Sequence, residues 1–295
     1  MCFLCSFVAI FFRMTLKLLS VICYLLFFCG GFFYPSSIFA GNNNSHPNQT
    51  FVISNSENLV NAPHNHLVLE AVDAMPSAGG YSTSASAQQR LQNAVVIDEN
   101  HLQINPTSAK PSFCSEATYL VFLKTLSLLQ EQGKLTLTPS LLAILRPLHQ
   151  EDGSGVWGRW NANGPGTARL FYELGLGPNF MDLSSAQPGD FLKVFWSDAI
   201  GSSEHGHSVV YLGTENKNDI LSILYWSSNI PNGYGKKAVP RSRMHHLLFS
   251  RLTHPEAILK ASSLPYRDAY LASLLHRSSS LQEMKTRVYS QVNQF

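Results

Sequence analysis

The sequence predicts an α+β fold in which N-terminal helices pack on a small antiparallel sheet. The apolar run 113–129 follows Ser112, a residue suited to cap a helix, and a shorter run, 139–146, lies between two prolines. From residue 187 onward, short apolar runs are separated by turns and polar loops, which is typical of strands joined by hairpins. Helices that come first and strands that follow them indicate the α+β class.

The remaining elements are predicted from the same two kinds of pattern. Gly133 ends the first helix, and Gly175 ends a third helix over 167–174. The predicted strands span 191–196, 207–213, 220–226 and 247–252. Two later stretches with helical character, 265–277 and 281–291, complete the chain.

Composition limits the class of protein. The chain has 295 residues, of which 45% are hydrophobic and 14% charged, and this suffices for one sizeable core. A formal net charge of +2 is too small to indicate a nucleic acid as partner. The basic group Arg241, Arg243 and Arg251 is typical of a solvated face, although it could also meet an acidic polymer. The sequence predicts no cofactor.

Residues 1–40 are typical of a targeting segment. Arg13 and Lys17 precede an apolar run, 18–33, and Ala40 offers a small residue at a cleavage site. The pattern predicts a signal peptide, with an uncleaved membrane anchor as the alternative. We therefore expect a protein that is secreted or periplasmic and that meets a membrane only through this segment, if it stays uncleaved.

The rest of the chain divides into three parts by composition. Small and polar residues with weak periodicity fill 41–110, which predicts a low-complexity tether or a loosely ordered pro-region. Two short pieces inside it, 67–75 and 91–105, could be locally ordered. The helices and strands described above form a predicted domain over 111–255. A helical extension over 256–295 follows it.

Cys114 is the cysteine on which the functional interpretation depends. The other four cysteines fall inside the predicted targeting segment, so a mature chain would keep Cys114 alone and could form no internal disulfide. Such a cysteine is either a buried structural thiol or a reactive one. Its place at the start of a helix favours a reactive thiol, because the unpaired N–H groups of the first turn stabilise a thiolate.

A cysteine hydrolase also needs an imidazole and a group that orients it. His207 begins a predicted strand and shares a face with Val209 and Tyr211. Asn229, or Ser227 before it, leaves the end of the next strand and could reach His207 if the two strands pair. Asp219, in the turn between those strands, is a further alternative for the third group.

The loop 153–166 is rich in glycine and carries Trp157, Arg159 and Trp160. Its tryptophans can anchor a packed turn. They can also line a groove, because Trp and Arg beside flexible backbone suit peptide or sugar ligands.

Three stretches of the chain form a recognisable set. They are Cys114-Ser115 at the head of an apolar helix, Pro188-Gly189-Asp190-Phe191-Leu192 entering a strand, and Gly206-His207-Ser208-Val209-Val210-Tyr211-Leu212-Gly213. Together they resemble the NlpC/P60 and CHAP group of papain-like cysteine peptidases and amidases. The resemblance implies a papain-like fold and cleavage of amide bonds in the peptide part of bacterial cell wall. It implies Cys114 as nucleophile, His207 as base and Asn229 as third group, and it makes Trp157, Arg159 and Trp160 candidates for substrate binding.

Other interpretations stay open at this stage. His205, His207, His245 and His246 could bind zinc, but they lack the companion Cys or Asp cluster of a strong site, and the sequence predicts no metal. Transglutaminase-like proteins share the helix-borne cysteine but normally end with an aspartate. A protein that keeps the hydrolase scaffold as a non-catalytic wall-binding module is the main alternative.

Overall fold

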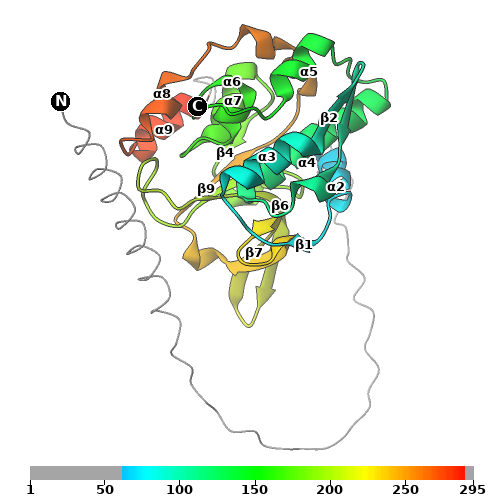
Figure 1. Ribbon diagram of the computed structural model, residues 1–295. Helices are drawn as coiled ribbons and strands as arrows, with labels where there is room; N and C mark the ends of the chain where they lie inside the picture. Colours follow the sequence, from blue (N-terminus) through cyan, green and yellow to red (C-terminus); the bar gives the residue numbers. More distant parts are fainter. Residues whose placement is uncertain (1–61, 290–295) are drawn as a thin grey trace, which may run out of the picture. The chain divides into compact units, whose positions relative to one another are not determined.

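A seven-stranded antiparallel sheet lies at the centre of the folded part of the chain (Figure 1). The computed structural model describes residues 62–289, so the predicted targeting segment lies outside the described residues. The strand order is β1-β8-β7-β6-β5-β9-β4. These strands span Ala78–Gly79 (β1), Asn179–Phe180 (β4), Phe191–Phe195 (β5), His207–Lys217 (β6), Ile220–Asn229 (β7), Gly233–Pro240 (β8) and His246–Ser250 (β9). A separate hairpin joins β2 (Val95–Asp98) and β3 (His101–Ile104).

Helices accompany the sheet, which confirms the predicted α+β class. The α-helices are α2 (Asn65–Asp73), α3 (Ala85–Ala94), α4 (Cys114–Glu131), α5 (Pro139–Leu145), α6 (Gly155–Trp160), α7 (Gly166–Leu174), α8 (Ala269–Ser273) and α9 (Leu281–Val288). Short 3-10 helices are η2 (Pro106–Ala109), η3 (Leu183–Ser185), η4 (Arg241–Arg243) and η5 (Pro255–Ser263). The almost wholly buried α4 is the longest described helix, as its apolar run predicted.

The two faces of the sheet are covered differently. The face toward α4 contributes Phe191, Val210 and Trp226 to the main core, which also contains side chains of α2, α3, α5, α6 and α7. The other face forms a cluster of strand side chains, including Leu192, Val209 and Tyr225. Among the described residues, no α-helix contributes to that second cluster. Successive side chains of β5 and β6 point to opposite faces of the sheet, and on each face they are buried in a core instead of facing solvent on one side.

Residues 62–110 are part of the core, so the prediction of a tether is wrong for this part of 41–110. Leu67, Val68 and Leu91 are buried against α4. β1 adds an edge strand to the sheet beside β8. The compositional signal failed because a few well-spaced apolar residues suffice when a long apolar helix offers the partner surface. All described residues belong to one compact unit, and residues 41–61 lie outside them.

A buried polar network ties α2 to the sheet. Asn65 Nδ2 donates to Asp190 Oδ1 at 2.9 Å, and Arg251 donates to both oxygens of the same carboxylate at 2.8 and 2.7 Å. Asp190 is fully buried, and the Arg251 side chain is 8% exposed. The expectation that Arg251 belongs to a solvated basic face is therefore wrong, whereas Arg243 is exposed on η4.

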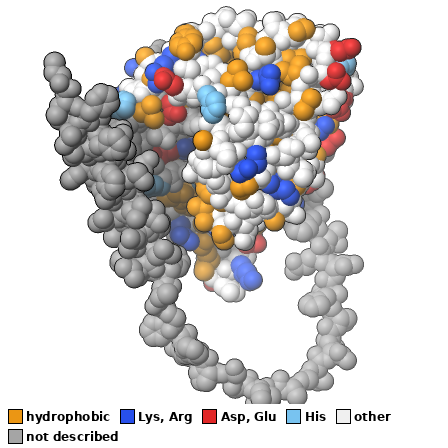
Figure 2. All heavy atoms as spheres, viewed as in Figure 1, with side chains coloured by type: hydrophobic (Ala, Val, Ile, Leu, Met, Phe, Trp, Pro, Cys, Tyr) orange, Lys and Arg blue, Asp and Glu red, His pale blue; other side chains and the backbone are white. Residues whose placement is uncertain are grey.

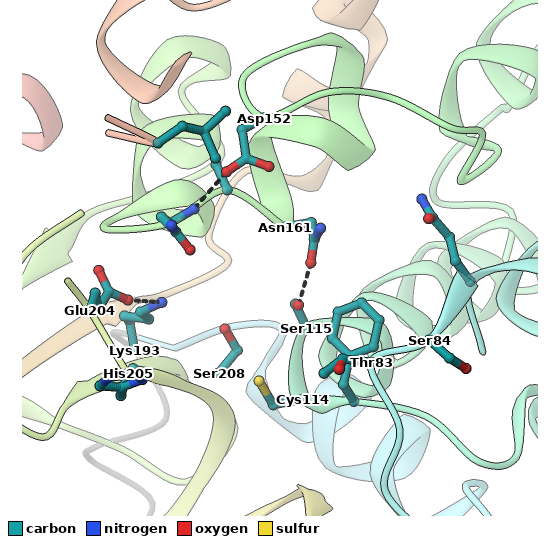
Figure 3. Close-up of a pocket in the computed structure, with 16 residues that line it drawn as sticks. Thr83, Ser84, Cys114, Ser115, Asp152, Asn161, Lys193, Glu204, His205 and Ser208 are labelled. Atoms are coloured by element: carbon teal, nitrogen blue, oxygen red, sulfur yellow. Dashed lines mark hydrogen bonds and ion pairs between the residues drawn. The ribbon is translucent and has the colours of Figure 1, made fainter. Parts of the chain in front are cut away.

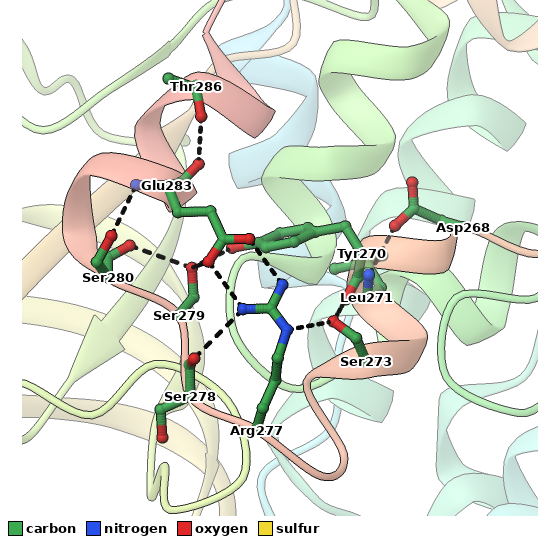
Figure 4. A network of polar contacts seen from close by, with 10 residues as sticks. All are labelled: Asp268, Tyr270, Leu271, Ser273, Arg277, Ser278, Ser279, Ser280, Glu283 and Thr286. Atoms are coloured by element: carbon green, nitrogen blue, oxygen red, sulfur yellow. Dashed lines mark hydrogen bonds and ion pairs between the residues drawn. The ribbon is translucent and has the colours of Figure 1, made fainter.

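The predicted helical extension forms η5, α8 and α9, and its end packs against α7. Arg277 donates to both oxygens of Glu283 at 2.8 and 2.6 Å, and Ser279 donates to the same carboxylate (Figure 4). Met284 of α9 is buried beside Ala168 of α7. The helix expected over 265–277 is shortened to α8, and α9 ends at Val288.

The surface adds two facts. On the face that Figure 2 shows, basic and acidic side chains are scattered, and neither kind covers a continuous area. Within residues 62–289, none of the helices combines the length and the apolar character that crossing a membrane requires.

Candidate active site

Cys114 is the first residue of α4 and is partly exposed. The residue that caps the helix is Phe113, not Ser112 as predicted, because Phe113 still has extended backbone. Ser112 lies one residue further back, where its carbonyl accepts a hydrogen bond from Ser228 of β7 at 2.8 Å. This contact fixes the entry of α4 against the sheet, near the end of β7 and the start of β6.

His207 begins β6, as predicted. Its ring packs between Trp196, at 6.4 Å between centroids, and Tyr225, at 5.6 Å. Pairing between β6 and β7 runs from Val210 opposite Trp226 toward the hairpin turn. Beyond that pair, the imidazole of His207 lies near Cys114, and its hydrogen bonding and charge lower the pKa of the thiol.

Asn229 lies at the end of β7 and holds the other side of the imidazole. Its amide nitrogen donates to the carbonyls of Ser227, at 3.0 Å, and Gly235, at 2.9 Å. Both N–H groups are then occupied, so Oδ1 faces His207 Nε2, 3.3 Å away, as an acceptor. This arrangement places a proton on Nε2 and leaves Nδ1 for the sulfur.

The two alternatives for the third group do not reach His207. Ser227 is fully buried, and its hydroxyl donates to the carbonyl of Ser208 at 2.7 Å. Asp219 lies in the turn between β6 and β7, at the far end of both strands from His207.

The surroundings of Cys114 favour a thiolate. Burial alone would raise the pKa of the thiol. The hydrogen bond and charge of His207, a hydrogen bond from the backbone of Ser208 and the charge of Lys193 outweigh burial and lower the pKa from 9.0 to about 6. A thiol of this pKa is mostly ionised at neutral pH, which is what a nucleophilic cysteine requires.

Tyr81 stands beside Cys114, and the sequence interpretation missed it. The pKa of Tyr81 is raised by burial, by the charge of Cys114 and by a hydrogen bond to its thiol, while a hydrogen bond from the Cys114 backbone lowers it. Tyr81 therefore lies close to Cys114. Gly79 and Gly80, both with positive φ, form the bend that brings Tyr81 alongside Ser112. The pair Gly79-Gly80 is the sequence signal that could have indicated a bend before Tyr81.

Glu116 lies in the first turn of α4 and is buried. Its Oε2 accepts the N–H of Phe113 at 3.2 Å, and its Oε1 accepts no hydrogen bond from the described residues. Burial raises the pKa of Glu116 to about 8, with the N–H of Phe113 opposing the shift and the charge of Cys114 adding to it. The carboxyl is thus mainly neutral at pH 7. A charged group there would oppose the thiolate, so the neutral cap suits the site.

The interpretation in which Trp157, Arg159 and Trp160 line a groove is wrong. Trp157 and Arg159 are fully buried, and Trp160 is 1% exposed. The tryptophans pack against Tyr119 of α4, while Arg159 pairs with Glu173 at 2.6 Å. The glycine-rich stretch folds into α6, where a Cβ on Gly158 would lie 2.2 Å from the carbonyl oxygen of Glu151. Glycine serves close packing here, not the flexibility expected of a binding loop.

A pocket of about 410 Å³ opens beside Cys114 (Figure 3). Its walls come from the start of α3, the first turn of α4, the ends of α6 and the loop that precedes β6. The polar residues around it include Ser115, Asp152, Asn161, Lys193, Glu204 and His205. Ser115 donates to Asn161 at 2.6 Å, which joins α4 to the loop after α6. None of these residues except Ser115 and His205 was singled out by a sequence pattern.

The histidines considered as zinc ligands are dispersed. His245 contacts Asp198 at 2.9 Å, His205 is an exposed residue of the pocket, and His207 faces Cys114. Residues 62–289 contain no group of three or more His, Cys, Asp or Glu that could hold a metal ion.

Comparisons with protein-family models, with curated proteins and with solved structures found no match to this chain.

Proposed function

We propose that this protein is a secreted cysteine hydrolase that cleaves amide bonds, with bacterial peptidoglycan as its substrate. The observation that carries the proposal is the Cys114–His207–Asn229 arrangement beside an open pocket. A structural thiol needs neither a lowered pKa nor an oriented imidazole. The resemblance to NlpC/P60 and CHAP hydrolases supports a papain-like fold and a wall peptide as substrate, since both place the cysteine at the head of a helix that packs on a sheet.

Each group then has a defined part in the reaction. The Cys114 thiolate attacks the carbonyl carbon of the scissile amide, and protonated His207 gives its Nδ1 proton to the leaving amine. Asn229 keeps the imidazole in place through Nε2 during this transfer. Neutral His207 then takes a proton from water, which hydrolyses the thioester and restores the thiolate.

In the transition state the carbonyl oxygen of the substrate gains negative charge. The N–H of Cys114 is the first hydrogen-bond donor to this oxygen, and the hydroxyl of Tyr81 is the second. Tyr81→Phe should lower kcat roughly 100-fold with little change in KM, because a donor to the oxyanion acts mainly in the transition state. Steady-state kinetics measure both constants. Tyr266→Phe is the matched control, since Tyr266 is 89% exposed. An unchanged kcat in Tyr81→Phe would remove Tyr81 from the mechanism.

Purified peptidoglycan tests the proposed reaction. The mature protein should release fragments with new amino groups, which mass spectrometry assigns to one class of bond. Cys114→Ser, which changes a single atom, should release none. If neither protein releases fragments and both sediment with peptidoglycan equally, the non-catalytic binding module is the correct function.

A further inference from the structure

The pocket beside Cys114 contains three charged side chains, and two of them neutralise each other. Lys193 forms an ion pair with Glu204. The same glutamate accepts the backbone N–H groups of Gly164, at 2.6 Å, and Gly201, at 3.2 Å, and its side chain is 3% exposed. Glu204 is therefore fully engaged in holding Lys193 and the two loops.

Asp152 is the third charged group, and it has an oxygen to spare. Oδ2 accepts the N–H of Asn163 at 3.1 Å, while Oδ1 accepts no hydrogen bond from residues 62–289. Arg267 donates through Nε to the backbone carbonyl of Asp152 at 3.0 Å, while its Nη1 pairs with the carboxylate of exposed Glu151 at 2.7 Å and leaves the Asp152 carboxylate without an ion pair among the described residues. In Figure 3, Asp152 lies on the opposite side of the pocket from Cys114.

The charge balance of the pocket follows from these contacts. The Lys193–Glu204 pair carries no net charge, so Asp152 leaves the pocket with one unpaired negative charge. Burial raises the pKa of Asp152, while the N–H of Asn163 and the charges of Arg267 and Lys193 lower it. A half-buried carboxylate with a free oxygen gains most from a ligand that brings a positive charge and a hydrogen-bond donor.

We propose that Asp152 is the specificity-determining residue of this pocket and binds an ammonium group of the substrate while the scissile carbonyl lies at Cys114. The substrate class is then an amide that carries a primary or terminal amine a few bonds from the bond that is cut. This inference rests on the proposed function for its substrate. Its test does not, because the thiol itself reports the local charge.

Two methanethiosulfonate reagents of opposite charge, 2-aminoethyl and 2-sulfonatoethyl, measure that charge. Each rate with Cys114 is divided by the rate of the same reagent with a small neutral thiol. The corrected ratio, cationic over anionic, should fall about 10-fold in Asp152→Asn and should stay near the wild-type value in Asp152→Glu. Glu151→Gln is the matched control, because it removes a charge one residue away that is 74% exposed and points to Arg267.

A second measurement uses hydrolysis. For a wall peptide that the wild type cleaves, Asp152→Asn should raise KM about 10-fold when the peptide's amine is free and leave KM unchanged when that amine is acetylated. Equal reagent ratios in the wild type and Asp152→Asn would overturn the inference. A changed ratio in a protein that cleaves no amide would instead keep the cation site and reject the hydrolase.

Discussion

Alkylation of Cys114 by iodoacetamide should follow a thiolate that forms near pH 6. Since the pKa of the thiol is lowered to about 6, the rate should be flat above that pH and fall as the pH drops through it. His207→Ala removes the hydrogen bond and the charge that outweigh burial. The transition should then move to the ordinary thiol range, about pH 8.5 or higher.

The change in rate is smaller than the change in thiolate population. At pH 6.5 the thiolate fraction should fall roughly 80-fold in His207→Ala, while the more basic thiolate reacts about 13-fold faster, which leaves a net loss of about 6-fold. The ultraviolet absorbance of the thiolate reports the population directly and should show the full effect. His205→Ala is the matched control, because His205 lines the same pocket and is exposed. A profile with an ordinary thiol pKa in the wild type would make Cys114 structural.

Asp190→Ala should strongly destabilise the protein, because Asp190 is the buried carboxylate that joins α2 to the sheet. It leaves the guanidinium of Arg251 buried without its carboxylate and removes one of the two acceptors of the Asn65 amide, so the free energy of unfolding should fall by about 3–5 kcal/mol. Urea unfolding of the full chain measures this loss. Asp73→Ala, on the exposed side of α2, should change stability by less than about 0.5 kcal/mol.

A double substitution separates the charge from the packing. Asp190→Ala with Arg251→Met removes both charges and should recover part of the lost stability, because an apolar side chain tolerates burial better than an unpaired cation. If the double variant is as unstable as the two single losses added together, the pair contributes through shape and not through charge.

The sequence was sufficient where one local pattern decided the structure. The apolar run after Ser112 predicted α4, and alternation predicted that His207 shares a face with Val209, which its contact with Tyr225 confirms. Asn229 could be proposed because two adjacent strands end at the same edge. Each of these inferences needed only period, order and strand pairing.

Features that depend on distant partners could not be predicted in this way. The sequence around Trp157 and Trp160 looks the same whether the two side chains line a groove or fill a core. The core position follows from the apolar surface of α4, which is distant in sequence. Strand β8 was missed because its residues, rich in glycine and lysine, do not indicate a strand. Its extended conformation depends on pairing with β7. Tyr81 and Asp152 reach the site through loops, and although Gly79-Gly80 indicates a bend before Tyr81, it does not indicate what that bend brings together.

The contact between Tyr81 and Cys114 limits how the protein can mature. Strand β1 belongs to the sheet and helix α2 to the core that contains α4, so removal of residues 62–113 would take away part of the fold around Cys114. Under the proposed function, a cleavage that activates the protein by removing an N-terminal segment should therefore fall before residue 62. Limited proteolysis within 62–113 should instead lower activity.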